Sequence, residues 1–294
     1  MSRPAERMSN GRSADEYWLP IEKGNQHRRR GGKRTVAVIG IGAGDPDYIT
    51  VQAINALNRA DVLFFLNKGR DRNDTVGLRR LICERYIRHH QYRIIEAVDP
   101  ERRLESDGRP YLVALSQWRD QRGALYRQLI ADNLDAGQVG AFLVWGDPAL
   151  YDGTLAILEA VRAQGEQFEV EVVAGISALQ ALTARHKIPL IRPGGAAQVT
   201  TGRRLIEQGW PAGVDDVVVM LDPACSFLHL IEKMLTIYWG AYLGTSDEIL
   251  LSGPLAECAE EIRRVRRSAR ARHGWLFDTY LLRRNRDDEC VSAG

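Results

Sequence analysis

The sequence predicts an α/β protein with two α/β domains and a ligand cleft between them. From Thr35 onward, short apolar runs typical of strands alternate with helical patterns. Several of these runs lead directly into turns of small residues. A stretch containing Pro and Gly, IRPGGAAQ at 191–198, separates two such sets and is interpreted as a linker. We therefore expect an N-terminal arm at 1–34, a first domain at 35–191 and a second at 198–294.

The elements of the first domain follow from local pattern. Thr50 is a helix-capping residue, and Ile54 and Leu57 lie on the apolar face of the helix that it starts. A polar stretch around DPERRLESDGRP is expected to be irregular. The expected strands are 36–39, 62–66, 139–145 and 170–173, and the expected helices are 50–57, 75–86, 124–134, 155–161 and the segment after AGISA.

The second domain repeats the alternation with different elements. A strand is expected from Val199 onward, and the last strand is expected to be DTYLLRR. The other expected strands are 217–221, a segment near 241 and 248–251, and the expected helices are 227–236 and 255–264.

Composition limits the function classes. No window approaches the roughly 18 apolar residues of a membrane span, and the N-terminus has no apolar region typical of a secretory signal. The four cysteines have no metal-ligand spacing, so reduced thiols in a cytoplasm are expected. Basic residues are concentrated in 1–34, whereas 35–294 is mildly acidic, so the tail is expected to be a solvated basic arm and a nucleic-acid partner is not expected.

Four segments share one pattern, in which a strand runs into a turn of small residues. They are VIGIGAGDP, FLVWGDPALYDGT, VVAGISA and AYLGTSDE. Ligands of parallel sheets bind outside the carboxyl ends of the strands, and glycine permits close backbone approach there. A dinucleotide site does not fit, because the third glycine comes too early and the second strand lacks the acidic residue at its tip. A phosphate loop does not fit either, since no strand-to-helix turn contains G-K-[ST].

The order of these motifs resembles the tetrapyrrole methylase family over about residues 35 to 285. The matching motifs are GIGAGDPDYIT, WGDPALY and VVAGISA with the later KIPL. More particular runs, among them LNKG, TTGRRL, VVVMLDPACSF and WGAYLGTSDEIL, resemble a branch of the family that removes an acetyl group while it methylates a corrin precursor. The resemblance implies S-adenosylmethionine (SAM) as methyl donor, an anionic tetrapyrrole substrate and a homodimer. Separately, the histidines at 89, 90, 186, 229 and 273 show no metal-ligand spacing, so no metal is expected.

The resemblance also implies site residues. The implied SAM-binding residues are Ala43, Trp145, Gly146, Asp147, Leu150, Ser177, Ala178, Leu221 and Gly244. The family often has Pro where Ala43 and Ala174 stand, and neither change removes a needed side chain. Related uroporphyrinogen methylases have an aspartate where Leu66 stands, so a general base cannot be carried over to that position.

Deacetylation should need a titrating or cationic group, for which Lys68 and Asp152 are candidates. A solvated lysine and a helix-capping aspartate are the alternatives. The candidate substrate-binding residues are Asn67, Tyr151, Arg203 and Arg204. Arginine makes forked pairs with carboxylates, although Arg203 and Arg204 could instead form surface ion pairs. Two other functions stay open: a methylase of another precorrin, of RNA or of protein, and a non-catalytic module that binds SAM or a nucleotide.

Overall fold

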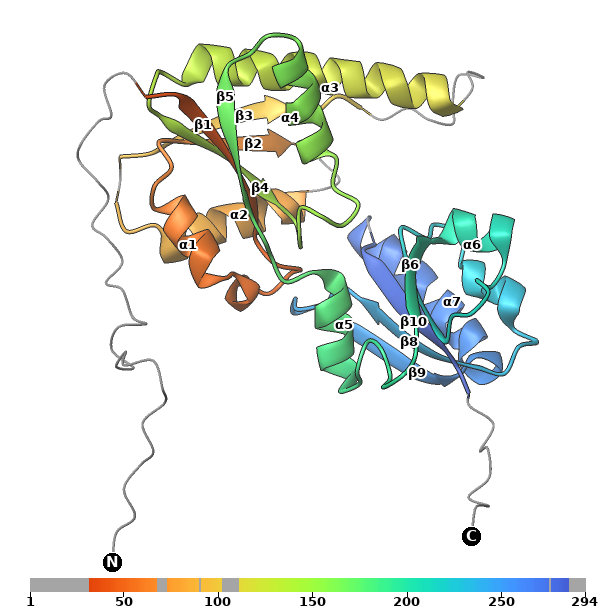
Figure 1. Cartoon of the computed structure of the whole chain (residues 1–294). Helices are drawn as coiled ribbons and strands as arrows, with labels where there is room; N and C mark the ends of the chain where they lie inside the picture. The colour runs from red at the N-terminus through yellow and green to blue at the C-terminus, as the bar shows by residue number, and fades with distance from the viewer. Residues whose placement is uncertain (1–31, 68–72, 90, 102–110, 275, 286–294) are drawn as a thin grey trace, which may run out of the picture.

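The computed structural model describes residues 32–67, 73–89, 91–101, 111–274 and 276–285 (Figure 1). It has two lobes, each built on a five-stranded sheet with helices on both faces. The predicted fold class is therefore confirmed. The predicted N-terminal arm lies almost wholly outside the described residues.

The first sheet is entirely parallel, with the strand order β3-β2-β4-β1-β5. Its strands are β1 (Arg34–Gly40), β2 (Val62–Asn67), β3 (Arg93–Val98), β4 (Val139–Val144) and β5 (Phe168–Val173). The three central strands are nearly continuous apolar runs, because a central parallel strand is covered on both faces. All five carboxyl ends lie at one edge, where the predicted turns begin.

Helices cover both faces of the first sheet. On one face lie α1 (Val51–Leu57) and α2 (Asn73–Tyr86), and on the other lie α3 (Tyr111–Asn133) and α4 (Thr154–Ala163) (Figure 1). Successive strand residues alternate between the faces. Ile39 and Phe65 pack toward α1 and α2, whereas Val38 and Phe64 pack toward α3 and α4.

The second sheet is mixed, with the order β6-β7-β10-β8-β9. Only β6 and β7 are parallel neighbours, and the remaining pairs are antiparallel. Its strands are β6 (Ala197–Thr201), β7 (Asp216–Met220), β8 (Leu235–Ala241), β9 (Ile249–Pro254) and β10 (Asp278–Arg284). One face is covered by α6 (Gly202–Gln208), the 3-10 turn η4 (Ser226–Leu230) and α7 (Leu255–His273). The carboxyl ends of β6, β7 and β8 therefore share an edge.

The helix α5 (Ala178–His186) covers the other face of the second sheet. It follows β5 of the first lobe directly, yet its Leu179 and Leu182 pack against Val218 and Leu281 of the second sheet. The chain thus crosses between the lobes at 174–177, upstream of the expected linker at 191–198. The expected first domain, 35–191, includes α5, but the packing of α5 is with the second lobe (Figure 1).

Some expected elements were wrong or incomplete. The helix expected at 227–236 is the short turn η4 followed by β8, which starts at Leu235 and is rich in β-branched and aromatic residues. The strand β3 was not predicted, because its six residues, RIIEAV, form no sustained apolar run or strict alternation. The helix α3 begins at Tyr111 rather than Ala124, and α7 extends to His273, where Gly274 ends it with a φ of 72°.

Candidate functional site

The turns after β1, β4 and β5 meet at the carboxyl edge of the first sheet. The backbones of Gly42 and Gly146 form an isolated antiparallel bridge, with N–O distances of 3.3 and 2.9 Å. The N–H of Gly175 donates to Oδ2 of Asp147 at 2.8 Å, which ties the third turn to the second. The three turns thus form one continuous backbone surface at the end of a parallel sheet, where ligands of such sheets bind.

Glycine is required where these turns touch. A Cβ on Gly175 would lie 2.1 Å from the carbonyl oxygen of Gly146. A Cβ on Gly40 would lie 2.6 Å from the backbone nitrogen of Gly175. Both distances are shorter than any real Cβ contact, so the close packing of the three turns excludes side chains at these positions.

Both Gly-Asp-Pro motifs use their aspartate in the same way. Oδ1 of Asp45 accepts the N–H of Asp47 at 2.8 Å, and Oδ1 of Asp147 accepts the N–H of Ala149 at 2.8 Å. Each carboxylate therefore holds the turn that follows it. Since Asp147 also binds Gly175 through Oδ2, both of its oxygens serve the shape of the turns.

The first turn also contacts the second lobe, backbone against backbone. Gly44 has a φ of 97°, and a Cβ there would lie 2.0 Å from the carbonyl oxygen of Leu243 in the turn after β8. Gly244 has a φ of 75°, and its Cβ would lie 2.7 Å from the nitrogen of Asp45 and 2.9 Å from the carbonyl oxygen of Ala43. The four segments singled out in the sequence therefore meet at one junction.

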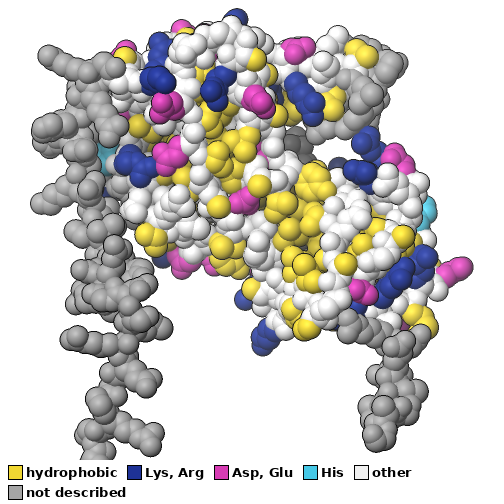
Figure 2. All heavy atoms as spheres, viewed as in Figure 1, with side chains coloured by type: hydrophobic (Ala, Val, Ile, Leu, Met, Phe, Trp, Pro, Cys, Tyr) yellow, Lys and Arg dark blue, Asp and Glu magenta, His cyan; other side chains and the backbone are white. Residues whose placement is uncertain are grey.

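One apolar cluster surrounds this contact and takes members from both lobes. Ala43 and Leu150 come from the turns of the first lobe, and Ala178 begins α5. The cluster members on the second sheet and its turns include Val218, Met220, Leu243 and Leu281. Figure 2 shows hydrophobic side chains gathered where the two lobes meet. Three of the residues implied for SAM thus lie in one apolar cluster.

Trp145 and Ser177 lie at the same junction with different roles. The ring of Trp145 stacks on Phe277 of the second lobe, with centroids 5.1 Å apart and an angle of 9° between the planes. The hydroxyl of Ser177 accepts the N–H of Leu179 at 3.2 Å and forms a capping box with Gln180 at the start of α5. Its side chain is thereby used to begin the helix.

Leu221 follows β7 with an unusual conformation. Its φ is 53°, in the left-handed region that costs a leucine roughly 1–3 kcal/mol, and its side chain is 60% exposed. The next residue is the buried Asp222, whose Oδ2 accepts from the Ser226 N–H at 2.6 Å and from the Tyr280 hydroxyl at 2.7 Å. This network holds the backbone of Leu221 in the strained conformation. Strain of this kind concentrates at functional sites.

Tyr151 of the first lobe and Arg204 of the second, both candidate substrate residues, lie near each other. Burial raises the pKa of Tyr151, and the nearby positive charge of Arg204 acts to lower it. Tyr151 is 47% exposed and has a φ of 53°.

The other two candidate substrate residues have different surroundings. Arg203 points to Glu207 at 3.8 Å on the surface of α6. Asn67 ends β2, and its carbonyl oxygen accepts the N–H of Asp99 at 2.9 Å.

Of the two candidate catalytic residues, the structure describes Asp152 but not Lys68. Lys68 lies outside the described residues. Oδ1 of Asp152 accepts the N–H of Thr154 at 2.7 Å at the start of α4, which is the helix-start contact of the alternative interpretation. A catalytic role for either residue stays a prediction.

A charged cluster beneath the carboxyl ends of β2, β3 and β4 was missed by sequence reasoning. Arg122 of α3 donates from Nε to Oδ1 of Asp99 at 2.7 Å and from Nη2 to the hydroxyl of Tyr126 at 3.1 Å. All three side chains are buried. Arg79 of α2 enters the same region. No local motif marks these residues, because they come from elements distant in the sequence.

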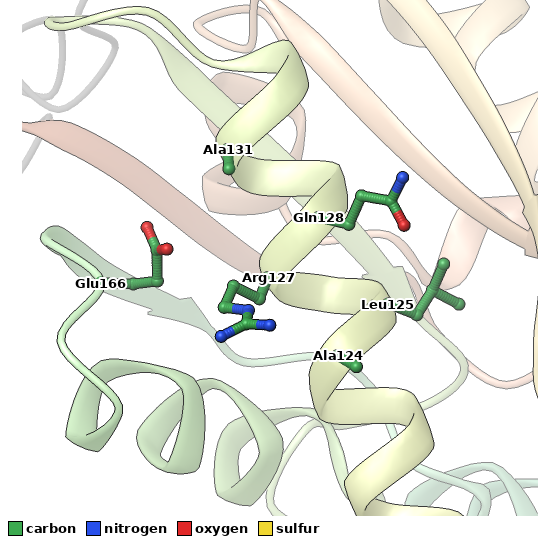
Figure 3. Close-up of a pocket in the computed structure, with 6 residues that line it drawn as sticks. All are labelled: Ala124, Leu125, Arg127, Gln128, Ala131 and Glu166. Atoms are coloured by element: carbon green, nitrogen blue, oxygen red, sulfur yellow. The ribbon is translucent and has the colours of Figure 1, made fainter.

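A surface depression lies elsewhere in the first lobe. It has a volume of about 520 Å³ and lies along the outer side of α3, where the side chains of Arg127 and Glu166 border it (Figure 3). None of its lining residues belongs to the glycine turns, so it does not mark the site.

Within the described residues, no group of three or more His, Cys, Asp or Glu is placed to hold a metal ion. None of the described helices is long and apolar enough to span a membrane.

The fold and the site define a class of two-lobed α/β proteins in which glycine turns of a parallel sheet meet the turns of a second, mixed sheet. The family model for Tetrapyrrole (Corrin/Porphyrin) Methylases matches residues 35–259. The chain belongs to this family.

Individual relatives agree with this assignment. The precorrin-6A synthase [deacetylating] of Sinorhizobium sp is 46% identical over 87% of this chain and 97% of the relative. The precorrin-2 C(20)-methyltransferase of the same source is 29% identical over 58% of this chain and 68% of the relative.

Solved structures show the same fold. A cobalamin synthesis related protein (CobF) from Corynebacterium diphtheriae superposes with a TM-score of 0.73 at 34% identity, over 86% of this chain and 99% of that chain. The uroporphyrin-III C-methyl transferase of Thermus thermophilus, complexed with S-adenyl homocysteine, shares the fold with a TM-score of 0.51 at 18% identity, over 84% of this chain and 91% of that chain.

Proposed function

We propose that this protein is a SAM-dependent C-methyltransferase of cobalamin biosynthesis. It methylates C1 of precorrin-5 and releases the C1 acetyl group as acetate, which gives precorrin-6A. The observation that carries the proposal is the 46% identity to a deacetylating precorrin-6A synthase over 97% of that relative. The meeting of the four turns at one junction supports it, because the residues matched to the family's SAM site, apart from Leu221, belong to these turns.

The chemistry of the junction suits SAM, which supplies an electrophilic methyl group on a sulfonium cation. The turns offer backbone carbonyl oxygens and an apolar wall formed by residues such as Ala43 and Leu150. Carbonyl oxygens stabilise a cation without acting as a competing nucleophile. Cys225, in the turn after β7, has its pKa raised by burial, so its thiol stays protonated at neutral pH and is a poor methyl acceptor.

The proposed reaction has two balanced parts. Water adds to the acetyl carbonyl, the bond between C1 and the acetyl carbon breaks, and acetate and two protons leave. The electron pair passes into the conjugated macrocycle, and C1 then attacks the methyl group in line with the C–S bond. Alignment of carbon and methyl is the main requirement, since good placement lowers a barrier by about 7–11 kcal/mol. Rigid turns held by Asp147 and the glycines provide that placement.

The decisive experiment incubates the purified chain with precorrin-5 and SAM that carries a 13C-labelled methyl group. We expect stoichiometric acetate and a product labelled at C1, both measured by NMR. Methylation without acetate would indicate another methylase of the family. Binding of S-adenosylhomocysteine without any turnover of precorrin-5, RNA or protein would indicate a non-catalytic module. Either result would overturn the proposal.

A further inference from the structure

Arg79 occupies the fork between two strands at the carboxyl edge of the first sheet. Its Nε donates to the carbonyl oxygen of Leu143 at 3.1 Å, and its Nη1 donates to that of Leu66 at 3.5 Å. The ladder between β2 and β4 ends at the pair Phe64 and Phe142. The two carbonyls therefore lie where the strands separate, and the guanidinium fills the gap between them.

The charges that neighbour Arg79 already have partners. Arg122 forms an ion pair with Asp99 at 2.7 Å, and both side chains are buried. Oδ1 of Asp152 accepts a backbone N–H at the start of α4. Among the described residues, Arg79 itself has no carboxylate within 4.0 Å, although the next residue on α2, Arg80, pairs with Glu96 on the surface.

The positive charge of Arg79 is poorly compensated by its surroundings. Burial lowers the pKa of Arg79, and the nearby Tyr126, Asp152 and Asp99 partly oppose that effect. An arginine remains protonated at neutral pH despite such a shift. A cation withdrawn from water without a paired anion is unfavourable, and an incoming anion would offset the cost. Arg79 is largely but not fully withdrawn from water, and the part that stays exposed lets an anion approach it.

The place of Arg79 in the fold indicates which anion. Leu143 lies two residues before Trp145, and β4 leads into the turn that carries Tyr151. The guanidinium thus lies beside the turns of the proposed active site. We propose that Arg79 is an anion-binding group of this site that takes a carboxylate, either the acetate formed from the acetyl group or a carboxylate side chain of the tetrapyrrole. This inference rests on the proposed function.

The test compares wild type with Arg79→Gln and, as a matched control, Arg80→Gln, which makes the same change on the exposed side of α2. Three quantities are measured: the KM for precorrin-5, the inhibition constant of sodium acetate, and the Kd of S-adenosylhomocysteine by calorimetry. Loss of a charge-assisted hydrogen bond corresponds to about a tenfold to hundredfold effect. We expect Arg79→Gln to show such a weakening toward one carboxylate ligand, with the Kd of S-adenosylhomocysteine changed less than about twofold.

The outcomes separate the two sources of the carboxylate. A weaker acetate inhibition in Arg79→Gln assigns the site to the acetyl-derived product, and a raised KM with unchanged acetate inhibition assigns it to a substrate side chain. Unchanged values for both, or equal effects in Arg80→Gln, overturn the inference. If Arg79→Gln does not fold, Arg79→Met removes the charge while it keeps an unbranched side chain, and unchanged KM and acetate inhibition in that variant likewise overturn the inference. A wild type that releases no acetate contradicts the proposed function instead.

Discussion

At the scale of single residues, Leu221 shows how local strain is held in place. Its left-handed backbone precedes Asp222, which is fixed by Ser226 and by the hydroxyl of Tyr280. The exposed leucine side chain contributes nothing to the described core, so its position fits a ligand contact better than a packing role. The cost of the conformation and the proposed contact can be separated by substitution.

We expect Leu221→Gly to leave the free energy of unfolding unchanged or to raise it by up to about 1 kcal/mol, because glycine adopts the left-handed region without strain. The same variant should weaken binding of S-adenosylhomocysteine, since the exposed side chain is lost. Urea unfolding and calorimetry measure the two effects. The control is Met234→Gly, because Met234 is also exposed, at 73%, but has no positive φ. It should be destabilising without changing affinity. An unaltered affinity in Leu221→Gly would contradict the role of this side chain.

At the scale of elements, α5 connects the lobes and carries a titratable group onto the second sheet. Nε2 of His186 lies 3.0 Å from the carbonyl oxygen of Trp239 in β8. Burial lowers the pKa of His186, whereas the bond to Trp239 and the charge of Glu248 act to raise it. Because the net shift is downward, the neutral imidazole belongs to the folded state.

The sign of the pH dependence follows. An unfolded histidine titrates near pH 6.5, so the unfolded chain binds more protons than the folded one as the pH falls through and below that value. The contribution of His186 to the free energy of unfolding should therefore be fully present above about pH 7 and decrease toward pH 5. His186→Gln, which can still donate to Trp239, should show a flatter dependence in urea unfolding, and the exposed His229→Gln should not. A slope equal to that of wild type in His186→Gln would rule out this contribution.

At the scale of the whole molecule, the two lobes meet through glycines at positions 44 and 244. A Cβ added at Gly44 would lie 2.0 Å from the carbonyl oxygen of Leu243, which leaves no room for a methyl group. The φ of 97° adds backbone strain of about 1–3 kcal/mol for any other residue. A side chain at Gly44 must therefore push the lobes apart.

We expect Gly44→Ala to keep the secondary structure of both lobes but to weaken binding of S-adenosylhomocysteine at least about tenfold, since about 1.4 kcal/mol of lost contact is enough for that change. Circular dichroism and calorimetry measure the two quantities. Gly77→Ala is the control, because its added methyl group meets nothing within 4 Å on the exposed side of α2. It should stabilise the helix by about 0.5–1 kcal/mol and leave binding unchanged. Normal affinity in Gly44→Ala would show that the contact between the lobes does not shape the site.

The sequence by itself determined the elements whose signals are local. Apolar runs marked the central strands β1, β2 and β4, because strands covered on both faces are apolar throughout. Glycines and Gly-Asp-Pro motifs marked the turns, since close backbone approach excludes side chains there. The family resemblance then indicated residues such as Ala43 and Leu150, which the structure places in one cluster.

Only the tertiary structure decided the features that depend on distant contacts. It placed α5 on the second sheet, joined Gly44 to Leu243, and brought Arg79 between the ends of β2 and β4. No local pattern encodes these contacts, because their partners are separated by many residues and are selected by burial and hydrogen bonding in the assembled lobes. The sequence predicted the turns, whereas the positions of the charged side chains around them and the contact between the lobes follow only from the folded chain.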